Sequence, residues 1–381
     1  MNNSIVITGI GVVSPLGVGM EMLWSNLLQS KTSLQYFADL DAAGYRNAYA
    51  CRVTDFDAPP VYRGAWMALD ATRQAITQSQ IQLPENAGVF LGSTLGESMA
   101  YEMAAEGADL NPEDYNTYSL ANTIAKAYSL SGPIQALSTA CTAGNYAVGA
   151  AMASLQRGDI AVAIAGAAEP FSRIAMVGFT RSRAMATDGC KPFDANRNGM
   201  VLGEGAAIFI LERKKDALQR GAEILAEVYS LGLSCDAYHP TSPHPDGRGL
   251  TRAMNTALES VRVNAGDIDW VNIHGSGTKV SDAAEALALK NVFEKNMPLL
   301  SGSKGAIGHA LGAASALELA ICVKGIVTQT IPPTPGFTIR DPDIDLDCTT
   351  EPIQKEIRFA INNASAFGGL NASLLLGSCT S

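Results

Sequence analysis

The sequence predicts an α/β protein in which mostly parallel sheets carry helices on their faces. Short apolar runs alternate with Ala-rich helical segments along the chain, which is the pattern of repeated strand and helix units. One plan also occurs twice: residues 133–168 and residues 298–332 each read as a strand, a turn, an Ala-rich helix and a second apolar run. We therefore expect two related halves, 1–230 and 231–381, that meet near residue 230.

Composition favours one large buried body rather than several small domains. The chain has 381 residues, 47% of them hydrophobic, and no low-complexity linker divides it. A net charge of -10 argues against a nucleic-acid partner, which requires a basic face. Seven cysteines without tight spacing suggest reduced thiols and a cytoplasmic location. The N-terminal run Ile5–Gly17 is interrupted by Gly and Pro, so we expect neither a signal peptide nor a membrane partner.

Two helices are expected to be buried and to pack closely. The segment from Ala143 to Arg157 ends at Gly158, and a second segment runs from His309 to Ile326. Both are rich in Gly and Ala on more than one side, and such small side chains allow backbones to approach each other. These helices therefore belong in the interior of the predicted fold.

Cys141 lies at the turn between the first of these helices and the short strand before it. The N-terminus of a helix carries free N–H groups and a partial positive charge, which stabilise a thiolate. This position predicts a reactive nucleophile. A buried structural cysteine is the alternative, because most free cysteines in proteins are of that kind.

Two of the four histidines follow apolar, strand-like runs in loops framed by glycine. They are His274, before Gly275, and His309, after Gly308. Together with Cys141 they indicate nucleophilic acyl chemistry. His239 and His244 stand in a proline-rich loop expected near the entrance. Prolines prevent a helix that would align these two rings, and no third ligand is near, so we expect no metal site.

The chain resembles a known family, the elongating type II beta-ketoacyl-acyl carrier protein synthases, along its whole length. The segments that carry the resemblance are Ile5–Gly17, Ser138–Cys141, Lys191–Gly199, Leu202–Ala206, Asp236–His239, His274–Thr278 with Asp282 and Glu285, Ser303–His309, and Phe367–Asn371. The resemblance implies a thiolase-like fold, in which duplicated halves form five αβαβα layers. It also implies an acyltransferase that needs no cofactor and joins malonyl-acyl carrier protein to an enzyme-bound acyl chain by decarboxylative Claisen condensation.

The resemblance assigns a role to each candidate residue. Cys141 accepts the acyl group, and the backbone N–H groups of Cys141 and Phe367 form the oxyanion hole. His274 and His309 donate hydrogen bonds to the enolate formed by decarboxylation. Lys304 is expected to pair with a carboxylate in the wall of the site, and the sequence suggests the carboxylate of Glu285.

The sequence departs from the family pattern at the expected substrate gate. Family members commonly read Asn-Ser-Phe-Gly-Phe-Gly-Gly before the last strand, whereas this chain has Ser365 in place of the first Phe and Ala366 in place of the Gly after it. Gly368 and Gly369 complete the gate loop. A smaller gate residue predicts a wider entrance that admits stiff, unsaturated or aryl-primed chains.

The resemblance also implies partners and leaves several functions open. The carrier protein, in its acyl and malonyl forms, is expected to dock near Arg63 and Arg197. The chain is expected to form a homodimer, or a heterodimer with a related ketosynthase-like subunit in a specialised aryl polyene or polyketide pathway. A non-catalytic chain-length partner would lack Cys141. A thiolase would need a second reactive cysteine, which the loop Phe367–Asn371 does not contain.

Overall fold

The computed structural model describes residues 4–45, 47–59 and 61–379, and its centre is one continuous mixed sheet. The strands of the first half are β1 (Ile5–Ser14), β5 (Gly88–Gly92), β6 (Ile134–Leu137), β7 (Val162–Glu169) and β8 (Gly205–Arg213). Those of the second half are β9 (Ala226–Cys235), β10 (Trp270–Asn272), β11 (Leu299–Ser301), β14 (Phe359–Ser365) and β15 (Leu370–Gly377). Short strands pair β2 (Gly17–Val18) with β1, β3 (Gln35–Tyr36) with β4 (Tyr49–Ala50), and β12 (Thr330–Ile331) with β13 (Ile353–Gln354).

The two halves of the sheet repeat one topology. In the first half, β6, β5 and β7 are parallel neighbours, and β8 and β1 follow as antiparallel strands. In the second half, β11, β10 and β14 are parallel, and β15 and β9 follow as antiparallel strands. The halves join where Ile5–Ile7 of β1 pair with Ala226–Val228 of β9. This confirms the internal repetition. Residue 230 lies inside β9, so a division at that residue remains a proposal.

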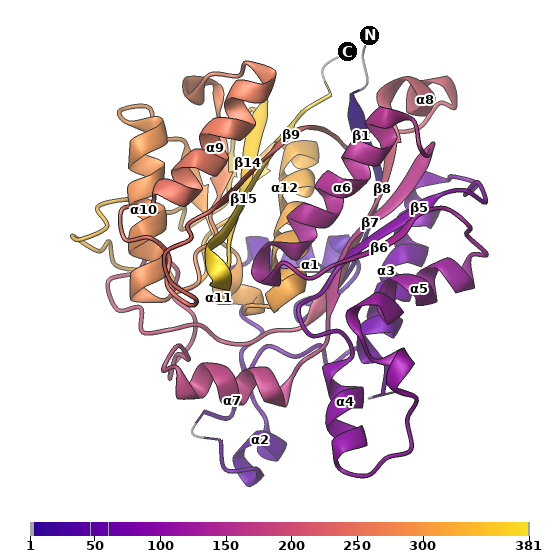
Figure 1. Ribbon diagram of the computed structural model, residues 1–381. Helices are drawn as coiled ribbons and strands as arrows, with labels where there is room; N and C mark the ends of the chain where they lie inside the picture. Colours follow the sequence, from indigo (N-terminus) through magenta and orange to yellow (C-terminus); the bar gives the residue numbers. More distant parts are fainter. Residues whose placement is uncertain (1–3, 46, 60, 380–381) are drawn as a thin grey trace.

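The two halves of the sheet form separate layers, with helices between them and on their outer faces, which makes five layers (Figure 1). The outer helices on one side are α3 (Arg63–Ser79) and α5 (Thr117–Ala127), and on the other side α9 (Arg248–Val261) and α10 (Lys279–Phe293). The central layer is α6 (Ala143–Arg157) and α12 (Ala314–Thr328). The other helices are α1 (Met20–Leu28), α2 (Ala38–Ala42), α4 (Ser98–Ala105), α7 (Arg173–Arg181), α8 (Lys214–Gln219) and α11 (Lys304–Ile307). The expected five-layered fold is confirmed.

The two central helices touch because their residues are small. A Cβ atom added to Gly144 of α6 would lie 2.6 Å from the backbone nitrogen of Ala316 in α12. The segment Leu311–Thr328 is long and apolar enough to cross a membrane, but 83% of it is buried inside the protein. It is therefore a core helix of the protein, as the small-residue pattern predicted.

Local structure shifts the predicted start of the second central helix. The sequence places this start at His309, whereas α12 begins at Ala314 after a 3-10 turn over Leu311–Ala313. Leu311 has a φ of 46°, in the left-handed region that a continuous helix excludes. The first central helix has its predicted bounds, Ala143 to Arg157.

Candidate active site

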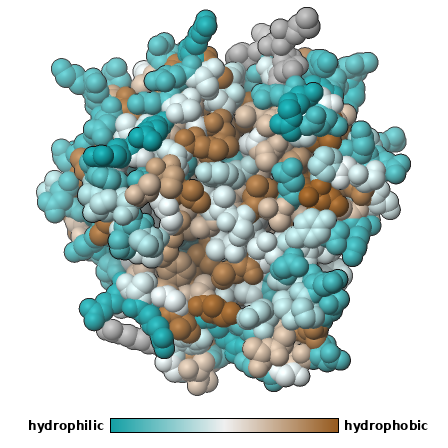
Figure 2. Space-filling model, viewed as in Figure 1, coloured by the Kyte–Doolittle hydropathy of each residue, from teal (hydrophilic) through white to brown (hydrophobic). Residues whose placement is uncertain are grey.

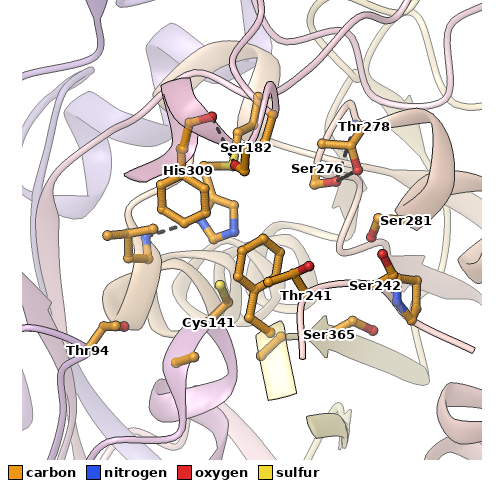
Figure 3. A pocket seen from close by; sticks show the side chains of 18 of the residues that line it. Thr94, Cys141, Ser182, Thr241, Ser242, Ser276, Thr278, Ser281, His309 and Ser365 are labelled. Carbon is orange, nitrogen blue, oxygen red and sulfur yellow. Dashed lines mark hydrogen bonds between the residues drawn. The ribbon is translucent and has the colours of Figure 1, made fainter. Parts of the chain in front are cut away.

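Residues from both halves line one cavity of about 430 Å³. Cys141, His274 and His309 all line it, so the three residues that the sequence singled out lie together. Figure 3 shows Cys141 and His309 in this cavity. Apolar side chains of the first half, including those of α7, line one part of the cavity. Hydroxyl groups gather in the part built by the second half, and these are Thr241, Ser242, Ser276, Thr278, Ser281 and Ser365. On the outer face, hydrophobic side chains collect over α7 (Figure 2), where Ile174 and Val177 are exposed.

Cys141 occupies a strained turn at the start of α6. It is the middle residue of the 3-10 turn Ala140–Thr142, and Ala140 before it has a φ of 50°. Non-glycine residues adopt this conformation at a cost, and such strain concentrates at functional sites. The turn aims the thiol into the cavity (Figure 3).

The thiol is protonated in the ligand-free site, contrary to the sequence-based expectation of a thiolate. Burial raises the pKa of Cys141 to about 12, although the positive charge of Lys304 acts in the opposite direction. The apolar surroundings therefore outweigh the favourable charges near the turn.

His309 is fixed by its backbone and by one ring nitrogen. Its N–H donates to the carbonyl of Val201 (2.7 Å), and its own carbonyl accepts from the N–H of Gly203 (3.0 Å). The backbone N–H of Leu311 donates to Nδ1 of the ring at 3.1 Å. Because an amide N–H can only donate, Nδ1 must accept, and the proton of the neutral ring is on Nε2. His309 is thus set to donate a hydrogen bond from Nε2.

His274 is held from the opposite side by backbone contacts. Glu285 accepts hydrogen bonds from the N–H groups of His274 (2.7 Å) and Gly275 (2.9 Å), and Lys304 donates to the His274 carbonyl. The rings of His274 and His309 lie edge to face, with centroids 5.4 Å apart. Within the described chain, Nδ1 of His274 is buried without a hydrogen-bond partner.

Both imidazoles are neutral. Burial lowers the pKa of His274 and of His309 well below the ordinary value, and the positive charge of Lys304 lowers both further. At neutral pH each ring therefore keeps one N–H and carries no charge. This is the form that donates a hydrogen bond to a developing anion.

The predicted pairing of Lys304 with Glu285 is wrong. Lys304 forms its ion pair with Glu318, and each side chain of this pair is 1% exposed. Glu285 instead binds the two backbone amides of the His274 loop. Both acidic residues support the histidines, but only Glu318 neutralises the lysine by direct contact.

The sequence contained a signal for Glu318 that was missed. Glu318 is the only acidic residue of α12, in a stretch whose residues from Ala314 to Val323 are all buried. A charge in such a helix requires a partner, because an isolated buried carboxylate is strongly unfavourable. Lys304, buried just before His309, supplies that partner.

The expected gate loop, between β14 and β15, lines the cavity. Ser365 lines the cavity, and its hydroxyl donates to Oδ1 of Asn371 at 2.9 Å. The ring of Phe367 is 5.5 Å from that of Phe179 in α7, and Phe367 is 41% exposed. The amides of Ala366 and Gly368, on either side of Phe367, donate to carbonyls of Leu370 and Pro240. Gly368 and Gly369 have φ values of 84° and 76°, which favour glycine.

A chain of hydrogen bonds connects the gate loop to the proline-rich loop. Nδ2 of Asn371 donates to Oδ1 of Asp236 at 2.9 Å, and Oδ2 of Asp236 accepts from the backbone N–H of His244 at 2.8 Å. Thr241, Ser242 and Pro243 of this loop line the cavity. The two loops therefore form one connected wall.

The structure does not support the predicted docking arginines. Arg197 is 4% exposed and contacts the carboxylates of Asp282 and Asp341. Arg63 bonds Glu204 through Nε at 3.1 Å and is largely buried. Arg197 is inside the protein, so its assignment to a docking surface is wrong, and Arg63 is committed to an internal ion pair.

Comparison with known proteins identifies the family. Residues 2–217 match the Beta-ketoacyl synthase, N-terminal domain, and residues 225–338 match the Beta-ketoacyl synthase, C-terminal domain. The chain belongs to the beta-ketoacyl synthase family. It is therefore an acyltransferase of the condensing class.

Relatives of this beta-ketoacyl synthase cover its whole length. A 3-oxoacyl-[acyl-carrier-protein] synthase 2 of Staphylococcus aureus is 32% identical over 98% of both chains. A putative polyketide beta-ketoacyl synthase 1 of Streptomyces halstedii is 32% identical over 99% of this chain and 98% of the relative.

Solved structures agree with this assignment. The ishigamide ketosynthase/chain length factor superposes with a TM-score of 0.92 at 34% identity, over 100% of both chains. A type II polyketide ketosynthase in complex with its acyl-carrier protein, AntDE:AntF, superposes with a TM-score of 0.91 at 26% identity, also over 100% of both chains.

In the described parts of the present chain, no group of three His, Cys, Asp or Glu side chains could hold a metal ion.

Proposed function

We propose that this chain extends a carrier-bound acyl chain by two carbons, with Cys141, His274 and His309 as its catalytic residues. The observation that carries the proposal is that one thiol and two neutral imidazoles face the same largely apolar cavity. The hydroxyl-lined part suits the amide groups of a carrier's pantetheine arm, and the apolar part suits an acyl chain.

The first half-reaction transfers the acyl group to Cys141. The sulfur attacks the thioester carbonyl, the carbonyl oxygen becomes an oxyanion, and the carrier thiol leaves with the proton that Cys141 gives up. The N–H groups of Cys141 and Phe367 are the proposed donors to the oxyanion. The amides of Ala366 and Gly368 are engaged elsewhere, which supports Phe367 as the donor from the gate loop.

The second half-reaction requires donors for an enolate. Malonyl-carrier protein loses carbon dioxide, and the electron pair left behind forms an enolate whose charge lies on the thioester oxygen. Nε2–H of His309 and an N–H of His274 stabilise this oxygen in a largely apolar cavity, where such hydrogen bonds are strong. The enolate carbon attacks the acyl-Cys141 carbonyl, and the Cys141 thiolate that leaves takes a proton from solvent.

The proposed partner is an acidic carrier protein that docks on Arg181 and Arg183. Both arginines are exposed at the end of α7, beside Ser182 of the cavity wall, and among the described residues neither forms an ion pair. Local positive charge at the mouth attracts an acidic partner although the whole chain carries a charge of -10.

The proposed substrates are wide or rigid acyl chains, because two positions in the wall lack bulk. Ser365 is one, where a larger residue would fill the cavity. Gly178 of α7 is the other: it lines the cavity, and an added Cβ would meet nothing within 4 Å. Its φ is not positive, and glycine destabilises a helix relative to alanine, so neither backbone conformation nor packing accounts for it. Space for a ligand explains why residue 178 is a glycine.

Assembly and location are also proposals. The edge strand β6 presents partly exposed residues and unpaired backbone groups, which suit pairing with a second subunit, either a copy of this chain or a ketosynthase-like relative. Cys141 favours the catalytic role in such a pair over that of a chain-length partner. Free thiols throughout the described chain fit a cytoplasmic location.

Intact mass spectrometry tests the proposed function. The protein is incubated with a panel of acyl-carrier proteins, and then with malonyl-carrier protein. We expect one acyl group on Cys141 and release of a β-ketoacyl-carrier protein, with neither event in Cys141→Ala. Acyl mass on another residue of that variant would overturn the assignment of the nucleophile.

A further inference from the structure

Glu169 is a buried carboxylate next to the catalytic turns that the reaction described above does not use. It ends β7 and is 0% exposed. Its carboxylate accepts hydrogen bonds from three backbone amides: Thr94 (2.5 Å), Leu95 (2.9 Å) and Gly312 (3.0 Å). Thr94 and Leu95 line the cavity, and Gly312 follows directly after Leu311, whose amide binds His309.

The turn that Glu169 holds is the structural counterpart of the Cys141 turn. Each turn is a three-residue 3-10 helix that leads into a 15-residue central helix, and each starts with a left-handed residue, Ala140 or Leu311. Gly312 therefore corresponds to Cys141. In the first half, the residue after the left-handed Ala140 is Cys141, which carries the thiol. In the second half, the residue after the left-handed Leu311 is Gly312, whose N–H donates to the carboxylate of Glu169.

We propose that Glu169 is a positioning residue: by binding the Gly312 amide it fixes the Leu311–Gly312 turn, so that the Leu311 amide keeps the proton of His309 on Nε2. The inference rests on the proposed enolate-stabilising role of His309. Without the carboxylate, the left-handed Leu311 can relax and its N–H can turn away from Nδ1. The ring then distributes its proton between both nitrogens and presents an acceptor to the enolate in part of the molecules.

Only a carboxylate fits the place that Glu169 occupies. All three of its contacts are N–H donors, so the side chain must offer acceptors on both oxygens. A glutamine would direct its own NH2 group at one set of these donors. The fit is also tight, since a Cβ on Gly312 would lie 2.5 Å from Oε2 of Glu169.

The charge of Glu169 opposes the first half-reaction, which separates its effect on the two steps. Burial raises the pKa of Glu169 to about 7, while its amide contacts favour the ionised form, so the carboxylate is mostly charged at pH 8. That negative charge raises the pKa of the Cys141 thiol. Removing it should therefore favour acyl transfer while it harms the step that needs His309.

The test compares Glu169→Gln with Glu97→Gln at pH 8. Glu97 is a matched control: it is 1% exposed, burial raises its pKa to about 7, and it accepts from two backbone amides, Gly64 and Ala65, at the start of α3. We expect Glu169→Gln to lower malonyl-carrier protein decarboxylation at least tenfold while acyl loading of Cys141 stays equal or becomes faster. Glu97→Gln should change neither rate.

Nitrogen-15 NMR of the four histidines gives a readout that needs no substrate. In ligand-free wild type we expect the His309 ring as the Nε2–H tautomer, and in Glu169→Gln a mixture of both tautomers, with His274 unchanged. A failed proposed function would appear as wild type that neither loads nor decarboxylates, and it would leave this NMR result intact.

Two outcomes would overturn the role of Glu169. One is an unchanged His309 tautomer in Glu169→Gln with unchanged decarboxylation, and the other is an equal loss of loading and decarboxylation with the tautomer retained. If Glu169→Gln does not fold, as judged by thermal unfolding, Glu169→Asp decides the question because it keeps the charge but shortens the reach. A mixed His309 tautomer in that variant supports the proposal, and an unchanged tautomer with unchanged decarboxylation overturns it.

Discussion

Lys304 and Glu318 form a buried ion pair that connects α12 to the loop of His274. Nζ of Lys304 binds both the Glu318 carboxylate and the His274 carbonyl, and each side chain of the pair is 1% exposed. The lysine charge also contributes to keeping both imidazoles neutral. One contact thus serves the core and the active site together.

Loss of either partner should therefore be much worse than loss of both. Lys304→Met or Glu318→Leu alone leaves an unpaired buried charge, and we expect each to lower the free energy of unfolding by about 3–5 kcal/mol. The double variant should recover a large part of this loss. Urea unfolding of the four proteins measures the coupling, and additive losses would show that the two charges do not depend on each other.

Stability should fall as pH rises from 6.5 to 8.5. Burial raises the pKa of Glu285 to about 8 and that of Glu97 to about 7, so these groups hold protons in the folded state that they have released in the unfolded state. The folded state then binds more protons, and the unfolding free energy decreases with rising pH. His274 and His309 oppose this trend at the lower end of the range, because their rings are neutral in the folded state but still bind some protons near pH 6.5 in the unfolded state; the effect ends once the unfolded rings are deprotonated as well.

Urea unfolding at several pH values tests this trend. The decrease should be on the order of 1 kcal/mol or more, because each unit of pKa shift corresponds to about 1.4 kcal/mol. Glu285→Gln should flatten the profile, whereas Glu356→Gln, at an exposed position, should leave it unchanged. A stability that increases over this range would contradict the assignment of raised carboxyl pKa values.

The sequence predicted the site well where residue type and position in an element decide the outcome. The prediction that three residues line one site rested on two observations. Cys141 lies between a short strand and an Ala-rich helix, and His274 and His309 lie in loops that contain glycine. The repeated strand and helix plan likewise predicted the duplicated sheet. These features depend on residues that are close together in the sequence, and such residues remain neighbours in the folded protein.

Pairings across the fold were harder to predict. Lys304 was assigned to Glu285 from the family pattern, whereas the direct ion pair is with Glu318 of α12. Arg197 was predicted to lie on the surface, whereas it is buried in contact with the carboxylates of Asp282 and Asp341. The pKa of Cys141 was also misjudged, because a helix N-terminus is visible in sequence but the depth of an apolar cavity is not.

His309→Ala should separate the two half-reactions. Its proposed role begins after acyl transfer, so acyl loading of Cys141 should remain substantial while malonyl decarboxylation falls by about 100-fold or more, the scale of losing one preorganised oxyanion donor. Single-turnover assays with each carrier substrate measure both steps. Glu356→Gln, at an exposed position that does not line the cavity, is the control and should leave both rates unchanged. Normal decarboxylation by His309→Ala would refute the role.

Reversing charge at the end of α7 should weaken carrier binding without damaging the chemistry. We expect Arg181→Glu and Arg183→Glu to raise the KM for acyl-carrier protein about tenfold at low salt, with a smaller effect at high salt because exposed charges are screened. Loading from a small acyl thioester without the carrier should not change. Lys215→Glu on α8, at the far end of the molecule in Figure 1, is the control. Equal effects of all three variants would rule out this docking patch.

Ser365→Phe should narrow the cavity selectively. Ser365 lines the cavity and is fixed by its bond to Asn371, so a phenyl ring at this position refills the space beside the acyl chain while it leaves Cys141 and both histidines in place. We expect loading of long or rigid acyl chains to fall at least about tenfold relative to butyryl chains, which corresponds to about 1.4 kcal/mol of differential barrier. Overpacking costs on the order of 1–3 kcal/mol, so some loss of stability is expected as well.

Two further variants decide whether added bulk, rather than the lost hydroxyl, causes this selectivity. Ser365→Ala removes the bond to Asn371 without adding volume and should keep the wild-type preference among acyl chains. Gly178→Leu adds bulk from α7, at a position where a Cβ meets no neighbour within 4 Å, and should reproduce the effect of Ser365→Phe. Mass spectrometry of acyl loading across chain lengths compares all three variants. A uniform loss for every chain in both bulky variants, or none, would show that neither wall sets the selectivity of the cavity.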